Sequence, residues 1–148
     1  MEIRRALPKD ASEIAKAELD IFTDPWNEGD IISVISTEGS MCYTALSDGN
    51  VISYIIGRQI APEGEIYRIA TIPEHRQRGV AYKLLDYAVK CERARGLESL
   101  FLEVREKNVA ARALYSSYGF REIGVRKNYY KNPTDNAIIM LLQNESDF

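Results

Sequence analysis

Cysteine and histidine are scarce in this chain, which has two cysteines (Cys42 and Cys91) and one histidine (His75) among 148 residues. Two cysteines cannot build a disulfide framework, and no Cys-x-x-Cys pair or histidine cluster is present to bind zinc. We therefore expect two free, packed thiols, a solvent-exposed His75 in a loop, no metal cofactor and a reducing cytoplasmic setting.

Long apolar runs and an excess of basic charge are also lacking. No segment approaches the roughly 20 apolar residues that cross a bilayer, and the start MEIRRALPKD has no apolar core of signal-peptide length. The formal net charge is −3 without a basic stripe, which argues against direct nucleic-acid binding. With no repeat, linker or membrane segment to divide it, residues 1–148 are expected to form one domain.

Hydrophobic periodicity indicates helices and strands in a mixed order. In the first predicted helix, the apolar positions include Ile14, Ala17, Leu19 and Ile21. The segment 99–104 is apolar on both faces, as in a strand covered by helices on both sides. Predicted strands cover residues 2–6, 41–46, 51–60, 65–72, 99–104, 120–130 and 136–142. Predicted helices cover about 8–22, 28–36, 80–95 and 109–118. This order of meander and crossover predicts a mixed α/β sheet with helices on its faces.

The clearest local motif is RQRGVA at residues 76–81, between a predicted strand and a predicted helix. A turn that leads into a helix exposes free backbone N–H groups, and the helix dipole adds partial positive charge, so phosphate groups bind well there. Gly79 permits a positive φ, and Ala81 keeps the first helical turn thin. A basic turn that only caps the helix explains the pattern nearly as well. The single glycine excludes a dinucleotide fingerprint.

This segment resembles the Arg/Gln-x-x-Gly-x-Gly/Ala motif of the GNAT superfamily of N-acetyltransferases. The preceding YRIATIP resembles the bulged fourth strand of that superfamily. The resemblance implies a mostly antiparallel mixed sheet of about seven strands flanked by about four helices, with acetyl-CoA as co-substrate. It implies that the pantetheine lies along Ile69, Ala70 and Thr71, and that the phosphates are bound by Gln77, Arg78, Gly79, Val80, Ala81 and Tyr82.

The C-terminal half is similar to one branch of this superfamily, the RimI-type ribosomal-protein-alanine N-acetyltransferases. The similarity lies in LEVREKNVAARALYSSYGF (102–120), RKNYY (126–130) and DNAIIM (135–140), with Asp-Pro-Trp at 24–26. It implies acetylation of the N-terminal alanine of a small-subunit ribosomal protein that carries a basic N-terminal segment. Residues 27–40 depart from the pattern. Two alternatives therefore remain: an acetyltransferase of the same superfamily that acts on a small-molecule amine such as a polyamine or amino sugar, and a non-catalytic CoA-binding module.

Acetyl transfer needs a base for the amine and an acid for the leaving thiol. Glu103 lies within an apolar strand and can be the base; the alternative from pattern alone is a structural carboxylate paired with Arg68 or Arg105. Tyr115 matches the family position of the acid, although a core tyrosine is the default for a helix. The family assigns packing to Tyr118.

Two further expectations concern the ligands. Asn108 lies seven residues before Tyr115, on the same helical face, and is predicted to bond the pantetheine, to cap the helix, or both. Acidic residues around the first two helices either hold a basic acceptor or form a solvated rim. They are Asp20, Asp24, Glu28 and Asp30. Trp26, Tyr129 and Tyr130 either wall the acceptor groove or pack beneath it.

Overall fold

The computed structural model describes residues 1–144, so residues 145–148 of the expected domain lie outside the described part. The predicted order of elements is confirmed, with the ends of most elements shifted by one or two residues. The strands are β1 (Glu2–Arg5), β2 (Tyr43–Ser47), β3 (Asn50–Ile60), β4 (Glu63–Thr71), β5 (Ser99–Arg105), β6 (Arg121–Tyr130) and β7 (Asp135–Gln143). The helices are η1 (Pro8–Asp10), α1 (Ala11–Ile21), α2 (Glu28–Ser36), η2 (Pro73–His75), α3 (Val80–Arg93) and α4 (Val109–Tyr118).

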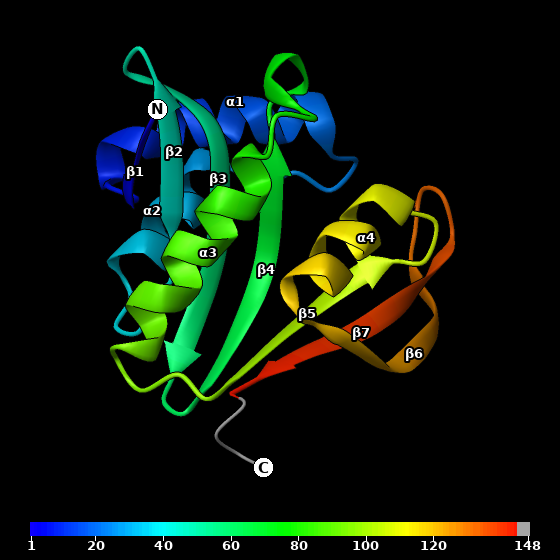
Figure 1. Cartoon of the computed structure of the whole chain (residues 1–148). Helices are drawn as coiled ribbons and strands as arrows, with labels where there is room; N and C mark the ends of the chain where they lie inside the picture. The colour runs from blue at the N-terminus through cyan, green and yellow to red at the C-terminus, as the bar shows by residue number, and fades with distance from the viewer. Residues whose placement is uncertain (145–148) are drawn as a thin grey trace.

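The strands form one seven-stranded sheet in the order β1-β2-β3-β4-β5-β7-β6. All neighbouring pairs are antiparallel except β4 and β5, as the family resemblance implies. Helices α3 and α4 lie on one face of the sheet, and α1 and α2 lie on the other (Figure 1). Within residues 1–144, no helix is long and apolar enough to cross a membrane.

The expectation that helices cover both faces of β5 is wrong. Helices α1 and α2 pack on the half of the sheet that contains β2, β3 and β4, in a core cluster that contains Ile14, Ile31 and Tyr54. The other cluster joins α3 and α4 to the sheet and includes Leu100 and Leu102 of β5. The opposite face of β5, β7 and β6, which we call the open face, therefore carries no helix among the described residues (Figure 1).

Strand β4 separates from β5 after its first half. The parallel register runs from Glu63↔Ser99 to Ile66↔Leu102 and stops there. At the same point, the β3–β4 register shifts, so Tyr67 is an extra, bulged residue between Ile66 and Arg68. This confirms the predicted bulge in the fourth strand. A bulge bends its strand and increases the local twist, which turns the end of β4 away from β5.

The apolar pattern of the first helix is partly wrong. Leu19 is 71% exposed, whereas Glu18 is 0% exposed. The helix turns Glu18 inward because its carboxylate has hydrogen-bond donors on three other segments, described below. Periodicity alone assigns a glutamate to the solvent side, and only long-range contacts reverse that choice.

Candidate active site

The turn before α3 has the geometry of an anion site. Gly79 has φ 75° and Gln77 has φ 63°, so both adopt left-handed backbone conformations. The first bond that closes a turn of α3 runs from the N–H of Lys83 to the oxygen of Gly79, at 3.1 Å. The three preceding N–H groups, of residues 80–82, have no backbone partner within residues 1–144 and carry the positive end of the helix dipole.

The two arginines of this turn differ in their contacts. Arg76 donates from Nε to the oxygen of Thr71 at 3.0 Å, which ties the turn to the end of β4. Arg78 is exposed and forms no ion pair with the described residues, so its guanidinium can contact an anion directly. His75, expected in an exposed loop, is only half exposed and ends the one-turn helix η2.

Beyond the bulge, the edge of β4 that faces away from β3 has backbone N–H and C=O groups that are not paired with β5, so an extended ligand can bind along it. The N–H of Ile72 donates to the oxygen of Ile52 at 2.9 Å, so alternate residues of this stretch face β3. Ile69 and Thr71 must therefore turn their N–H and C=O groups toward the gap left by β5. Ala70 faces the other way, because its oxygen accepts from Ser53 Oγ at 2.8 Å. Two of the three residues predicted to line the pantetheine thus face the opening.

Glu103 lies on the open face of β5. Its neighbours Leu102 and Val104 are buried against α3 and α4, and the Glu103 side chain is 20% exposed. Arg126 Nε approaches Glu103 Oε2 at 3.5 Å, yet this oxygen is buried and accepts no hydrogen bond from the described residues. A buried carboxylate oxygen without a donor is available to accept a proton or a donor from a ligand.

The alternative partners expected for Glu103 are wrong. Arg68 binds Glu18 and Asp24, while Arg105 donates to the carbonyl oxygens of residues 131 and 133. The actual partner, Arg126, lies on β6 and was not identified from the sequence. The strand register brings Arg126 near Glu103. Ala137 of β7 pairs with Arg126 of β6 on one side and with Arg105 of β5 on the other, and Glu103 lies two residues before Arg105.

Glu103 shares its surroundings with two other titratable groups. Burial and then the negative charge of Glu103 raise the pKa of the Glu65 carboxyl above its usual range. Burial and then the charge of Glu103 also raise the pKa of Tyr130 to about 12. Glu65 belongs to β4 and Tyr130 to the end of β6. The open face therefore brings two carboxylates and a neutral phenol together beside the opening of β4.

Tyr115 lies on the other side of the sheet, in α4. Its ring is 4% exposed and packs on Phe120 at 5.6 Å between ring centroids. Burial, followed by the influence of Tyr130, raises the pKa of the Tyr115 phenol above its usual value. The hydroxyl makes no hydrogen bond to residues 1–144. Tyr130 thus interacts electrostatically with both predicted catalytic groups.

Asn108 caps α4, as one of its two expected roles requires. Its Oδ1 accepts from the N–H of Ala111 at 3.2 Å. The amide nitrogen of Asn108 is left for a ligand, and the residue is exposed.

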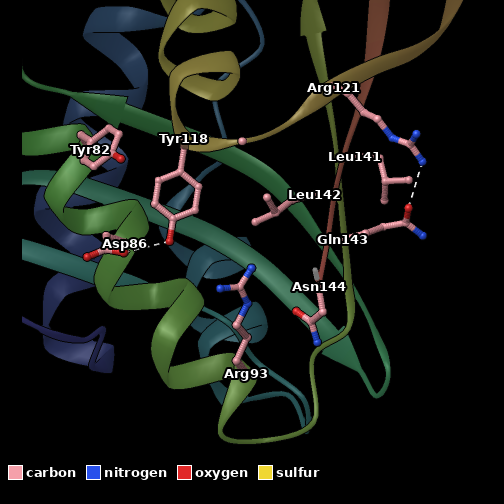
Figure 2. Close-up of a pocket in the computed structure, with 10 residues that line it drawn as sticks. Tyr82, Asp86, Arg93, Tyr118, Arg121, Leu141, Leu142, Gln143 and Asn144 are labelled. Carbon is pink, nitrogen blue, oxygen red and sulfur yellow. Dashed lines mark hydrogen bonds between the residues drawn. The ribbon is translucent and has the colours of Figure 1, made fainter. Parts of the chain in front are cut away.

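Tyr82 and Tyr118 border a separate groove of about 700 Å³. Their rings meet edge to face at 5.3 Å, and the Tyr118 hydroxyl donates to Asp86 at 2.9 Å. Figure 2 shows Arg93 of α3 pointing into this groove from one side, and Leu142 of β7 and Asn144, which follows β7, from the other. No residue of β4 lines it, and neither Glu103 nor Tyr115 does. Tyr82 is thus the one predicted cofactor residue in this groove. Tyr118 is partly buried and packs against the core cluster of α3 and α4, in the packing role expected for it.

The four acidic residues near α1 and α2 do not form one cluster. Asp24 binds Arg68, whereas Asp30 borders a hollow of about 390 Å³ together with Pro25, Trp26 and Val34. Asp20 and Glu28 are exposed. The side chain of Asn27 begins α2 by accepting from the N–H of Asp30 at 2.8 Å.

Comparison with known sequences gives a consistent result. The profile of the acetyltransferase (GNAT) family matches residues 11–120. The ribosomal protein bS18-alanine N-acetyltransferase of Haemophilus ducreyi is 32% identical over 147 residues, which cover 95% of this chain and 98% of the relative.

Solved structures show the same similarity. The ribosomal-protein-S18-alanine N-acetyltransferase of Escherichia coli superposes with a TM-score of 0.88 at 30% identity, covering 96% of this chain and 92% of that one. Naa20 of Chaetomium thermophilum, in complex with a bisubstrate analogue, superposes with a TM-score of 0.84 at 26% identity. That match covers 99% of this chain and 88% of the other.

Proposed function

The chain belongs to the GNAT family of acetyltransferases, and we propose that it acetylates the N-terminal α-amino group of a ribosomal protein. Membership makes it an N-acetyltransferase that uses acetyl-CoA. The observation that carries the proposal is the opening between β4 and β5, with the N–H groups of α3 at one end and Glu103 on the open face. Such an opening lets a thioester and an amine meet from opposite faces of the sheet.

The residues present fit acetyl-CoA. A diphosphate needs N–H donors and positive charge, and the start of α3 with Arg78 offers both. A pantetheine arm carries amide groups. The outward N–H and C=O groups of Ile69 and the N–H of Thr71 can pair with them as a neighbouring strand would, while the oxygen of Thr71 already accepts from Arg76. Asn108 would add a side-chain amide contact. Bound there, acetyl-CoA supplies the activated acetyl carbonyl.

We assign Glu103 as the general base. An α-amino group has a pKa of about 7.7–8.0, against about 10.4 for lysine. Near neutral pH an α-ammonium therefore loses its proton far more easily than a lysine side chain does, and a carboxylate is a strong enough base to accept it. The buried Oε2 of Glu103, which accepts no hydrogen bond from the described residues although Arg126 Nε lies 3.5 Å away, can take the proton of the ammonium directly or through one water. The neutral amine then attacks the acetyl carbonyl in a ternary complex, without an acyl-enzyme.

We assign Tyr115 as the acid that serves the departing sulfur. Its raised pKa keeps the phenol protonated at physiological pH, and its hydroxyl has no partner among the described residues. The phenol can therefore donate a hydrogen bond to a nascent thiolate, whose conjugate thiol has a pKa near 8.5. Donation lowers the energy of the leaving group without requiring complete proton transfer.

The acceptor follows from the relatives and from the open face. The relative from Haemophilus ducreyi acts, by its name, on the alanine of ribosomal protein bS18. A basic N-terminal segment of a small-subunit ribosomal protein suits the carboxylates of Glu65, Glu103 and Asp30 on this side of the molecule. An acceptor on the ribosome would place the reaction in the cytoplasm.

A panel of acceptors tests the proposal. The protein is mixed with acetyl-CoA and an Ala-Arg-starting peptide, its N-blocked lysine-containing version, or spermidine, and thiol release is followed. We expect turnover with the free α-amine and very little with the blocked peptide. Preference for spermidine would overturn the protein acceptor, and thiol release with none of the three would leave the assignment of the acceptor without support.

A further inference from the structure

A buried carboxylate joins three segments beside the open face. Glu18 of α1 is 0% exposed. Its Oε2 accepts from the hydroxyl of Tyr54 at 2.5 Å, and its Oε1 accepts from Arg68 Nε at 3.1 Å and from the N–H of Trp26 at 3.1 Å. Both oxygens are therefore satisfied, and the backbone of the α1–α2 loop is attached to them.

Arg68 attaches the same loop at a second point. Its Nη2 donates to the backbone oxygen of Asp24 at 2.8 Å and lies 3.3 Å from Asp24 Oδ1. The guanidinium lies 3.8 Å from the centroid of the Phe22 ring. One arginine, with a side chain that is 13% exposed, thus contacts both the beginning and the middle of the loop formed by residues 22–27.

The other end of this contact is the bulge of β4. Arg68 directly follows the bulged residue Tyr67, whose ring stacks on Trp26 with centroids 6.0 Å apart and planes at 25°. Tyr67 remains 42% exposed. Trp26 and Tyr67 together form an aromatic wall, which is held from behind by Arg68 and Glu18 and borders the stretch of β4 that opens from β5.

A buried ion pair of this kind adds little net stability, because desolvation of both charges offsets their attraction. Its effect is geometric: it permits one arrangement of hydrogen bonds and so one position of the loop. We propose that Arg68 is a positioning residue for the acceptor. It sets the aromatic wall of Trp26 and Tyr67 against which the first residues of the acceptor peptide pack. This inference depends on the proposed function, since the acceptor is taken to be a peptide.

The loop can be observed without any activity measurement, because Trp26 is the only tryptophan of the chain. Arg68→Met keeps the length of the side chain and removes the guanidinium, and Arg58→Met on the exposed part of β3 is the matched control. We expect Arg68→Met to increase acrylamide quenching of Trp26 and Arg58→Met to leave it unchanged. Equal quenching in wild type and both variants, with all three folded, would overturn the proposal.

Steady-state kinetics provides the second test. For Arg68→Met we expect the KM for the Ala-Arg peptide to rise about tenfold, while the KM for acetyl-CoA changes less than about twofold. Arg68→Lys keeps the positive charge but cannot contact Glu18 and Asp24 at the same time, so its KM for the peptide should lie between those of wild type and Arg68→Met. Equal effects on both KM values, or on kcat alone, would reduce Arg68 to a structural role. If the wild-type enzyme does not acetylate the peptide, the proposed function is refuted. The quenching experiment does not depend on activity, so it would still show whether Arg68 fixes the position of the loop.

Discussion

Replacing Tyr115 by phenylalanine separates catalysis from stability in this enzyme. The ring is 4% exposed and packs on Phe120, and phenylalanine retains that packing. The hydroxyl makes no hydrogen bond within residues 1–144, so its removal breaks none. The free energy of unfolding should therefore stay within about 0.5 kcal/mol of wild type, which corresponds to roughly 1–2 °C in Tm.

Catalytic activity, in contrast, should fall. A positioned proton donor contributes about 10²–10⁴-fold to a rate, so Tyr115→Phe should lower kcat by about 100-fold with little effect on the KM for acetyl-CoA. Because burial raises the pKa of Tyr115, the phenol stays protonated throughout roughly pH 6–9, and the ratio of wild-type to variant kcat should not depend on pH in that range.

Tyr118→Phe is the matched control, since Tyr118 lies on the same helix and loses a hydrogen bond to Asp86. That variant should lose about 1 kcal/mol of stability and retain wild-type kcat. Thermal unfolding and thiol-release kinetics on the three proteins measure both quantities. Wild-type kcat in Tyr115→Phe, or a fall in kcat accompanied by a matching fall in Tm, would refute the assignment of Tyr115 as the acid.

Three further predictions follow from the site. Glu103→Gln should lower kcat at least tenfold by thiol release and leave the KM for acetyl-CoA unchanged; unaltered kcat would remove Glu103 as base. Gly79→Ala adds a side chain that meets nothing within 4 Å, so its cost is the φ of 75° alone, about 1–2 kcal/mol in denaturant unfolding, and CoA affinity should fall as the turn relaxes. Stability equal to wild type would contradict the left-handed turn. Glu65 has a raised pKa in the folded protein, so its stabilising effect is present below the unfolded pKa and is lost as pH rises through the folded value. Glu65→Gln should therefore exceed wild type in Tm at neutral pH and match it near about pH 4, and a constant difference between these pH values would contradict the shift.

Local features of this fold could be predicted from the sequence. Gly79 and Gly119 both adopt positive φ at helix ends, and Asn108 caps α4, because each of these depends on a few neighbouring residues. The alternation in β5 that separates Glu103 from Leu102 is equally local.

Contacts between distant segments could not be predicted in this way. Glu18 is buried because its partner Arg68 lies 50 residues away, on a strand that the helix pattern does not describe. Arg126 reaches Glu103 only through the register of β5, β7 and β6. The placement of Ala70 away from the opening depends on which residue of β4 is bulged, and hydrophobic periodicity does not specify that residue.

Calorimetric titration of the protein with CoA, and in parallel with pantetheine, probes the proposed phosphate site itself. In the proposed complex, the diphosphate of CoA binds the N–H groups of residues 80–82, at the start of α3. CoA should therefore bind with measurable heat, and pantetheine, which lacks the diphosphate, should bind much more weakly. Absence of CoA binding to folded protein, or equal affinity for the two ligands, would contradict this assignment of the turn.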